Sequence, residues 1–416
     1  MKKLLSVLLV LVMVFSLAAC GSGDNGGEAE GEVYNVGMIC IGDENAAYDR
    51  NFYMAADAAK EQLAAKGINI EWTYTYNHPE GDPVATDCRD LGDAGCIAVF
   101  CNSYGMEPAM LTVAPEYPDT VFVGMTNENS WKDDLDNTVN AFPSVYEGRY
   151  LAGIAAGLKL NEMIAAGQFK PEEAKIGYVG AFTYAEVISG YTSFFLGARS
   201  VCPTATMEVT FTGSWYDETA EKEAANKLIG NGCKLISQHA DSMGAPTACE
   251  TAGVPNVSYN GSTEAACPNT FIVSSRINWA PYYEYAITAV VNGETIDADW
   301  TGTLATGSVV LTDINTAVAA EGTAEAIADA TAKLESGEVQ VFDCSAFTVS
   351  GDNVTDAMTV DADGHVTSYL ADVDTDAAYT GDTEAVENGA FKESTFRAAP
   401  YFDLKIDGIT LLDTAF

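Results

Sequence analysis

Short apolar runs alternate with helical patterns along most of the chain, and this alternation constrains the fold more than any other feature. Residues 33–41 and 96–103 are apolar runs of strand length, and residues 51–67 between them carry apolar side chains at helical spacing. Short strands separated by helices are typical of right-handed βαβ units around a parallel sheet. The pattern therefore predicts the α/β fold class.

The same pattern occurs twice. A long helix of small residues is expected over 145–167, and a second series of strands and helices begins at residue 174. The chain is therefore expected to form two Rossmann-like lobes. Thr-, Val- and Asp-rich stretches over 295–311 and 339–370 predict β-hairpins. The predicted divisions are lobe 1 over 34–143, lobe 2 over 144–275, return segments that complete the lobes over 276–345, and a β-rich acidic C-terminal extension over 346–416.

The N-terminus predicts export. Two lysines precede an apolar run over 4–19, which is shorter than the roughly 20 residues of a membrane span and is typical of a secretory signal. The run ends in LAAC, which resembles a bacterial lipobox and implies lipidation of Cys20. Residues 1–19 are thus expected to be a lipoprotein signal peptide, and residues 20–33, poor in apolar side chains, a flexible tether. An ordinary signal peptide with a chance cysteine is the alternative.

Charge and cysteine usage narrow the function classes. The formal net charge is −40, which argues against a nucleic-acid partner because phosphates need cationic side chains.

Most of the nine cysteines other than Cys20 stand in apolar strand-like or helix-like stretches, where a free thiol acts as a small hydrophobe. A disulfide stays open as an alternative, since an exported chain can form one.

The motifs of common enzyme classes are missing from the sequence. No GxGxxG follows the first strand, and there is no GxxxxGK[ST], HExxH, CxxC or GxSxG. The residues therefore predict no metal site, no cofactor and no catalytic residue. Spacing alone leaves open the carboxylate pair of a glycosidase.

Aromatic and short polar residues gather where the predicted strands end. In open parallel sheets, ligands bind beyond the carboxyl ends of the strands. Aromatic faces suit a planar ligand, and carboxylates and amides accept from N–H groups or sugar hydroxyls. We therefore predict a cleft for a planar, nitrogen-rich, hydroxylated small molecule, although core packing is an equal alternative for any single aromatic. Tyr259 is a further aromatic candidate, and the predicted ligand-binding residues are Tyr48, Asp49, Asn51, Phe52, Asn102, Ser103, Tyr104, Asn127, Phe182, Trp215, Asp241, Ser242, Asn260 and Trp279.

The stretch QHADS has the residue types of a nucleophilic triad. His239 and Asp241 share one face of an extended segment, whereas Ser242 points elsewhere and precedes a helix. A hydroxyl at that place is ordinarily a helix cap. We therefore interpret Asp241 and Ser242 as groups presented to a ligand and His239 as a structural neighbour.

Several segments resemble one known family. The stretches are 145–157, 174–203, 212–232, 238–242 and 278–283, and they are similar to the basic membrane protein, or PnrA-like, family of substrate-binding lipoproteins of ABC transporters. The resemblance covers roughly residues 34–345. It implies the type I periplasmic-binding fold, in which three hinge strands join two Rossmann-like lobes. It further implies a purine nucleoside or free purine base as ligand.

The resemblance also implies roles for single residues. Tyr48 would stack on the base, and Asp49 or Asn51 would bind its edge. Nucleoside-binding members have an acidic residue where this chain has Asn260, and a lysine that the segment 276–279 lacks. These departures favour a free base such as adenine or hypoxanthine.

The implied protein is a monomer anchored by its lipid to the extracytoplasmic face of the cell membrane. Residues 393–410 resemble the close of longer members from Gram-positive bacteria. The protein would deliver its ligand to an ABC permease and ATPase without being an enzyme. An exported nucleoside-processing hydrolase and a ligand-binding sensor without a permease are the alternatives.

Overall fold

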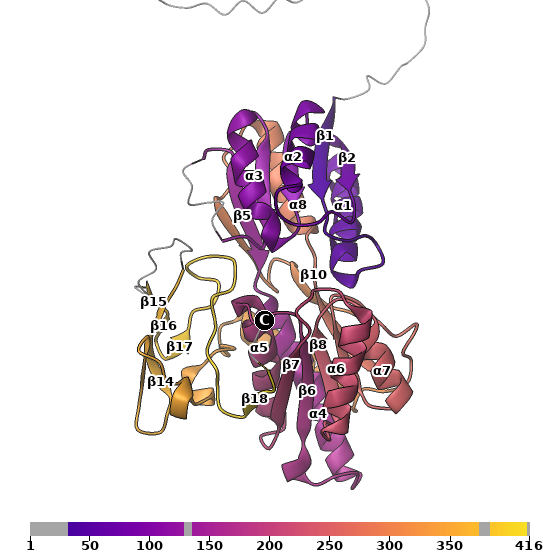
Figure 1. The fold of residues 1–416 in the computed structure, drawn as a ribbon, viewed down its shortest axis with the longest axis vertical. Coiled ribbons are helices and arrows are strands. Elements are labelled where there is room, and N and C mark those ends of the chain that lie inside the picture. Colours follow the sequence, from indigo (N-terminus) through magenta and orange to yellow (C-terminus); the bar gives the residue numbers. More distant parts are fainter. Residues whose placement is uncertain (1–31, 129–134, 374–382, 414–416) are drawn as a thin grey trace, which may run out of the picture.

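Two parallel sheets form the centres of two lobes in the computed structural model (Figure 1), which describes residues 32–128, 135–373 and 383–413. The sheet of lobe 1 has the order β11-β5-β4-β3-β1-β2, and all of its strands run parallel. Its strands are β1 (Val33–Ile39), β2 (Asn69–Thr75), β3 (Ala98–Cys101), β4 (Val121–Met125), β5 (Thr138–Pro143) and β11 (Asp299–Gly302). Side chains of α1 (Ala47–Ala65) and α8 (Ala280–Asn292) share one apolar cluster, and those of α2 (Val84–Asp93) and α3 (Glu107–Val113) share another.

The sheet of lobe 2 has the order β12-β10-β9-β8-β6-β7-β18, in which only β12 is antiparallel to its neighbour. Its strands are β6 (Lys175–Gly180), β7 (Thr206–Phe211), β8 (Leu235–His239), β9 (Asn256–Tyr259), β10 (Phe271–Ile277), β12 (Val309–Leu311) and β18 (Ile409–Leu411). The larger apolar cluster holds α4 (Val145–Ala165), α5 (Ala185–Val201) and α9 (Thr323–Glu335), and the smaller holds α6 (Glu218–Gly230) and α7 (Gly244–Ala252). The predicted α/β class with two Rossmann-like lobes is confirmed.

The main chain passes between the lobes at three places. It leaves β5 at Pro143 for α4, leaves β10 at Ile277 for α8, and leaves β11 at Gly302 for β12. The hairpin predicted over 295–311 is wrong, because β11 joins the sheet of lobe 1 and β12 that of lobe 2. An alternating pattern identifies a strand but not its partner, so the crossover looked like a turn.

Helices α4 and α5 pack with their backbones close together because glycine occupies the contact. A Cβ on Gly153 would lie closer than 3.0 Å to the carbonyl oxygen of Phe194, and one on Gly197 would lie equally close to that of Tyr150. The close pair positions residues near the cleft, because α4 carries the fully buried Arg149 and α5 begins at the cleft.

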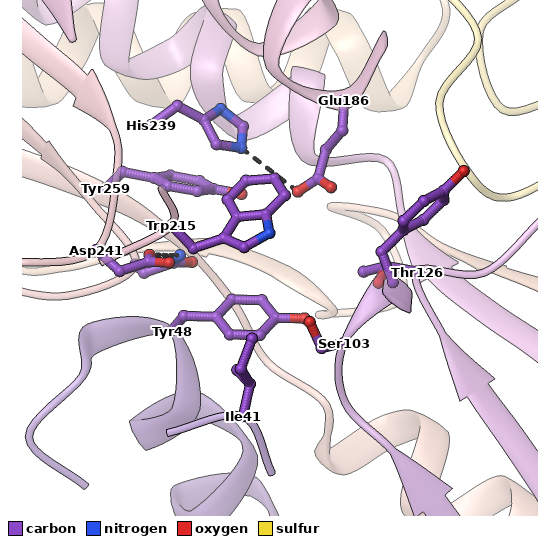
Figure 2. Close-up of a pocket in the computed structure, with 11 residues that line it drawn as sticks. Ile41, Tyr48, Ser103, Thr126, Glu186, Trp215, His239, Asp241 and Tyr259 are labelled. Carbon is purple, nitrogen blue, oxygen red and sulfur yellow. Dashed lines mark hydrogen bonds and ion pairs between the residues drawn. The ribbon is translucent and has the colours of Figure 1, made fainter. Parts of the chain in front are cut away.

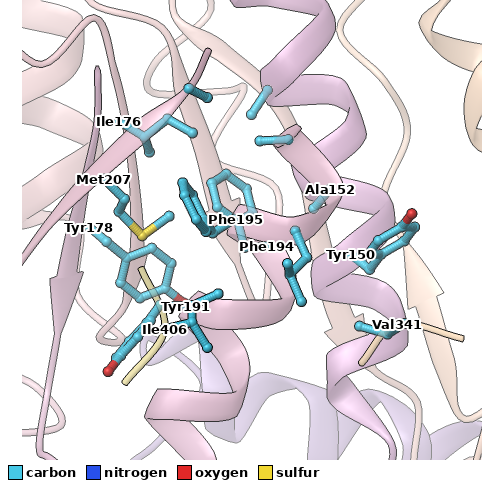
Figure 3. Packing of buried hydrophobic residues seen from close by; sticks show 14 of the residues in the cluster. Tyr150, Ala152, Ile176, Tyr178, Tyr191, Phe194, Phe195, Met207, Val341 and Ile406 are labelled. Carbon is cyan, nitrogen blue, oxygen red and sulfur yellow. The ribbon is translucent and has the colours of Figure 1, made fainter. Parts of the chain in front are cut away.

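The C-terminal extension lies against one side of lobe 2 (Figure 1). Its short strands are β13 (Met358–Val360), β14 (Val366–Ala371), β15 (Thr383–Glu384), β16 (Val386–Glu387) and β17 (Ala390–Phe391). Figure 3 shows Ile406 of the extension beside Tyr191 and Met207 in the core of lobe 2. The extension is therefore part of that core, and β18 adds a strand to its sheet.

The nine cysteines from Cys40 to Cys344 are all buried and free, which agrees with their prediction as small hydrophobes. Among the described residues, no helix is long and apolar enough to cross a membrane. The predicted signal run and the lipidation site Cys20 lie outside the described residues.

Candidate ligand-binding cleft

Three adjoining cavities lie between the lobes, at the carboxyl ends of the strands. The innermost has a volume of about 30 Å³, the outer one about 630 Å³, and a side cavity about 110 Å³. The first holds about one water molecule, whereas the second has the size of a small-molecule site. Figure 2 shows Tyr48 and Ile41 of lobe 1 facing Trp215, Asp241 and other side chains of lobe 2 across the innermost cavity.

A buried carboxylate on lobe 1 is held by two donors that stand beyond neighbouring strand ends. Asp49, in the first turn of α1, is 2% exposed. Its Oδ1 accepts from the backbone N–H of Gly42 at 3.0 Å and from Nδ2 of Asn102 at 2.8 Å. The amide oxygen of Asn102 accepts from the N–H of Ile41 at 2.9 Å. Burial raises the pKa of Asp49, and the bond from Asn102 opposes this rise.

Tyr48 is fixed beside this carboxylate. Its hydroxyl donates to the carbonyl oxygen of Asn102 at 2.6 Å, and its ring meets Phe52 edge-on at 4.9 Å. Phe52 in turn packs on Trp279 at 5.1 Å, and both are fully buried. Tyr48 therefore reaches the cavity, whereas the two rings behind it belong to the core of lobe 1.

The aromatic side of lobe 2 consists of three rings. Phe182 stacks on Tyr184 with the ring centroids 5.0 Å apart, and Trp215 meets Phe182 edge-on with the centroids 5.1 Å apart. The carbonyl oxygen of Trp215 accepts from the N–H of Asp241 at 2.9 Å, so the two loops that carry them are joined by the backbone. Tyr184 also approaches Tyr104 of lobe 1 at 5.6 Å, which closes the cleft at that edge.

Asp241 provides a second carboxylate, opposite Asp49. Its Oδ1 accepts from Nδ2 of Asn260 at 3.1 Å. Burial is the main cause that raises the pKa of Asp241 well above its usual value, and the nearby Glu221, Asp49 and Glu186 add to the rise. Asn51 does not line the cavities but donates across the lobes to the carbonyl oxygen of Asn260 at 2.9 Å.

The triad suggested by QHADS does not assemble. The hydroxyl of Ser242 accepts from the N–H of Gly244 at 3.0 Å, as a residue before a helix does. Nε2 of His239 lies 3.4 Å from a carboxylate oxygen of Glu186, and burial lowers the pKa of His239. Nδ1 of His239 lies 3.4 Å from the hydroxyl of Tyr178, so the two ring nitrogens face Tyr178 and Glu186 and not Ser242.

The cavities sort the predicted residues into two groups. Those that line a cavity are Tyr48, Asp49, Ser103, Tyr104, Phe182, Trp215, Asp241 and Asn260. Those that support them from behind are Asn51, Phe52, Asn102, Asn127, Ser242 and Trp279. The side chain of Asn127 is buried and has no hydrogen-bond partner among the described residues.

Sequence reasoning missed several residues that line the innermost cavity. Thr126 and Ile41 stand at strand ends, and Glu186 stands in the first turn of α5. His239, interpreted as a neighbour, lines the cavity directly and packs on Tyr259 at 4.4 Å. The available signal for Glu186 was its place in the helix that follows the Phe182 strand end.

The charge of the cleft has one sign. Arg149 is buried behind Tyr259, where its guanidinium group lies 5.2 Å from the ring centroid and donates to the hydroxyl of Ser237 at 2.7 Å. Among the described residues, no lysine or arginine lines the three cavities. The carboxylates that do are Asp43, Asp49, Glu80, Glu128, Glu186 and Asp241.

Two Rossmann-like lobes with three crossings and a cleft at their strand ends define the type I periplasmic-binding fold. Solved solute-binding proteins of ABC transporter systems share this fold. One from Conexibacter woesei is 22% identical with a TM-score of 0.59, covering 74% of this chain and 98% of that chain. One from Aeropyrum pernix is 17% identical with a TM-score of 0.61, covering 77% and 94%.

The chain belongs to the PnrA-like family of ABC transporter substrate-binding proteins, whose family model matches residues 36–342. The family and the fold predicted from the sequence are thereby confirmed. A Haloferax volcanii protein, TsgA13, provisionally named as an ABC transporter glucose-binding protein, is 32% identical over 67% of each chain. A Brucella abortus purine-binding protein is 30% identical over 58% of this chain and 65% of its own. A Lactococcus lactis nucleoside-binding protein, BmpA, is 25% identical, and the chain covers 64% of it.

Proposed function

We propose that the protein captures a purine base or purine nucleoside in the cleft and delivers it to an ABC permease and its ATPase. The observation that carries this proposal is the pairing of aromatic faces with buried carboxylates from both lobes. Tyr48 and Asp49 stand on lobe 1, and Trp215 and Asp241 stand on lobe 2. A purine presents flat faces to the rings and N–H groups to the carboxylates. The names of the Brucella and Lactococcus relatives support the same ligand class.

A hexose is the second candidate, because the Haloferax relative is provisionally named for glucose. Carboxylates accept sugar hydroxyls as well as ring N–H groups. The rings of Phe182, Tyr184 and Trp215 favour the purine, since they form a continuous aromatic side on lobe 2.

The proposed mechanism is lobe closure. Contacts such as the hydrogen bond from Asn51 to Asn260 and the approach of Tyr104 to Tyr184 join the two lobes across the cleft. A ligand that contacts both lobes binds the closed form more tightly than the open form, so it shifts the population toward closure. Delivery needs no covalent step. The two lobes must then reopen so that the ligand can pass to the permease.

The carboxylate lining predicts that phosphorylated ligands are rejected. Calorimetric titration with adenine, hypoxanthine, adenosine, inosine, glucose and adenosine monophosphate compares the candidates directly. We expect a purine base or nucleoside to bind and the monophosphate to bind at least about 100-fold more weakly, because like charges in a partly desolvated cleft cost several kcal/mol.

If the protein binds glucose and none of the purines, the purine assignment is rejected and a hexose is the ligand class. Equal affinity for adenosine and its monophosphate would contradict the charge argument. Chromatography of inosine after incubation tests the hydrolase alternative, and steady multiple turnover that Asp241→Asn abolishes would establish it.

We also propose that the mature protein is a monomer anchored through a lipid on Cys20 at the extracytoplasmic face. Cys20→Ser is expected to move the protein from the membrane fraction to the soluble fraction, because the tether that follows carries no other apolar anchor. Ser22→Ala, which leaves the lipobox cysteine in place, is the matched control. Membrane retention of Cys20→Ser in fractionation would reject the lipid anchor.

A further inference from the structure

One short segment of the C-terminal extension, residues 393–402, contacts both lobes. We call it the strap. Ala398 is fully buried in the apolar cluster of lobe 1, whereas Tyr401 and Phe402 are buried in that of lobe 2. Only two residues separate Ala398 from Tyr401, so the strap passes from one core to the other like the three main-chain crossings.

The strap is hydrogen-bonded to a strand of lobe 1. The N–H of Ala398 donates to Oδ2 of Asp299 at 2.8 Å, and Oδ1 of Asp299 accepts from Nδ2 of Asn140 at 2.6 Å. These two residues stand on β11 and β5, the strands from which two of the crossings depart. The strap therefore binds lobe 1 at its hinge edge.

Arg397 fixes the conformation of the strap and forms an ion pair with lobe 1. Its side chain is 5% exposed. Nε donates to the carbonyl oxygen of Ala399 and Nη2 to that of Pro400, each at 3.1 Å. Nη2 also lies 3.3 Å from Oε1 of Glu128, which stands three residues beyond the end of β4. Because Arg397 is buried and Glu128 is only 19% exposed, removing one partner of this ion pair is costly.

On lobe 2 the strap is anchored through sheet and core. β18 pairs in parallel with β7, and the carboxylate of Asp413 accepts from the hydroxyl of Thr210 at 2.5 Å and the N–H of Phe211 at 2.9 Å. Phe402 stacks on Phe342 at 4.2 Å. This end is part of the lobe, so movement between the lobes must act on the contacts with lobe 1.

The strap also reaches the ligand cleft. Ala399 and Pro400 line the side cavity of about 110 Å³ together with Tyr104 of lobe 1 and Glu186 of lobe 2. The hydroxyl of Tyr104 donates to Oε2 of Glu128 at 3.3 Å, on the same carboxylate that pairs with Arg397. One carboxylate thus connects the strap to an aromatic wall of the cleft.

We propose that the strap is a fourth connection between the lobes, which forms one wall of the cleft and limits how far the ligand-free protein opens. Arg397 is its positioning residue. A brace of this kind raises the fraction of protein in the binding-competent form, and apparent affinity increases in proportion to that fraction. The proposal rests on the proposed function only in that the cleft must open and close.

The test compares Arg397→Gln with wild type, both without ligand. Small-angle scattering is expected to show a larger radius of gyration for Arg397→Gln. Hydrogen exchange at the amide of Ala398 is expected to be at least about tenfold faster in that variant, because its bond to Asp299 opens with the strap. The amide of Leu412, which donates to Val209 within lobe 2, is expected to exchange at the wild-type rate.

Arg89→Gln is the matched control, since Arg89 pairs with Glu116 at 2.6 Å on the surface of lobe 1. It is expected to leave scattering and both amides unchanged. A folded Arg397→Gln with the wild-type scattering profile would overturn the proposal. If Arg397→Gln does not fold, the same two measurements are made on Glu128→Gln, which removes the other partner of the ion pair. In addition, exchange of the Ala398 amide in wild type at the rate of an unprotected amide would refute the strap as a connection between the lobes. Neither measurement uses a ligand, so a wrong purine assignment does not affect the result.

Discussion

Trp215→Ala is expected to weaken purine binding by about 1–3 kcal/mol, the range that loss of one aromatic–base contact produces. The indole is partly exposed in the cleft, and it lines both the innermost and the outer cavity. Its loop is held by a backbone bond from the N–H of Asp241 to the carbonyl oxygen of Trp215. The side chain can therefore be removed while the loop stays in place.

Titration calorimetry with the purine that wild type binds most tightly measures this effect. Trp215→Phe keeps an aromatic face and is the matched control, with an expected loss below about 1 kcal/mol. Tyr48→Ala tests the facing ring of lobe 1 in the same way. If both alanine variants bind as tightly as wild type, the base does not stack on these rings.

Gly153→Ala is expected to destabilise the protein by more than about 3 kcal/mol, beyond the usual cost of an added core methyl group. The new Cβ would lie closer than 3.0 Å to the carbonyl oxygen and carbonyl carbon of Phe194. These are backbone atoms of α5, so no side chain can rotate away. Helices α4 and α5 would have to separate, and with them the supports of Arg149 and Glu186.

Gly230→Ala is the matched control for this substitution. Gly230 is also helical, but a Cβ there would meet nothing within 4 Å. Alanine is the better helix former, so this variant is expected to equal wild type or to gain up to about 1 kcal/mol. Urea unfolding followed by circular dichroism gives both values. A denaturation midpoint for Gly153→Ala equal to that of wild type would show that the two helices can adjust.

The strand-end argument placed Tyr48, Trp215 and Asp241 near the cleft edge of the sheets, because the carboxyl ends of parallel strands meet at one edge of a sheet. All three line the innermost cavity, and their contacts with a ligand stay predictions. The argument passed over Ile41 and Thr126, which stand at strand ends of the same cavity. The argument could not tell which way a side chain points. Phe52 and Trp279 stand close to the same edge but turn into the core of lobe 1, where they pack on each other.

Residues that reach the cleft from other elements were less accessible to prediction. Glu186 lies on a helix, and its contact with His239 depends on how α5 packs over β8. Pro400 lies 98 residues beyond Gly302, where the last crossing leaves β11, and nothing in its local pattern indicates a cleft. Long-range placement of this kind depends on packing of the whole chain, not on periodicity.

The place of β18 has a consequence for the order of folding. Lobe 2 completes its sheet only when residues 409–411 pair with residues 207–209, and lobe 1 needs α8 and β11, which follow most of lobe 2 in the chain. Contacts between such distant residues are slow to form, because a long loop must close first. Lobe 1 therefore cannot complete its sheet until residue 302 has been synthesised, and lobe 2 cannot complete its sheet until residue 411 has been. A polypeptide that is slow to fold suits secretion through a narrow translocation pore, which admits extended chains.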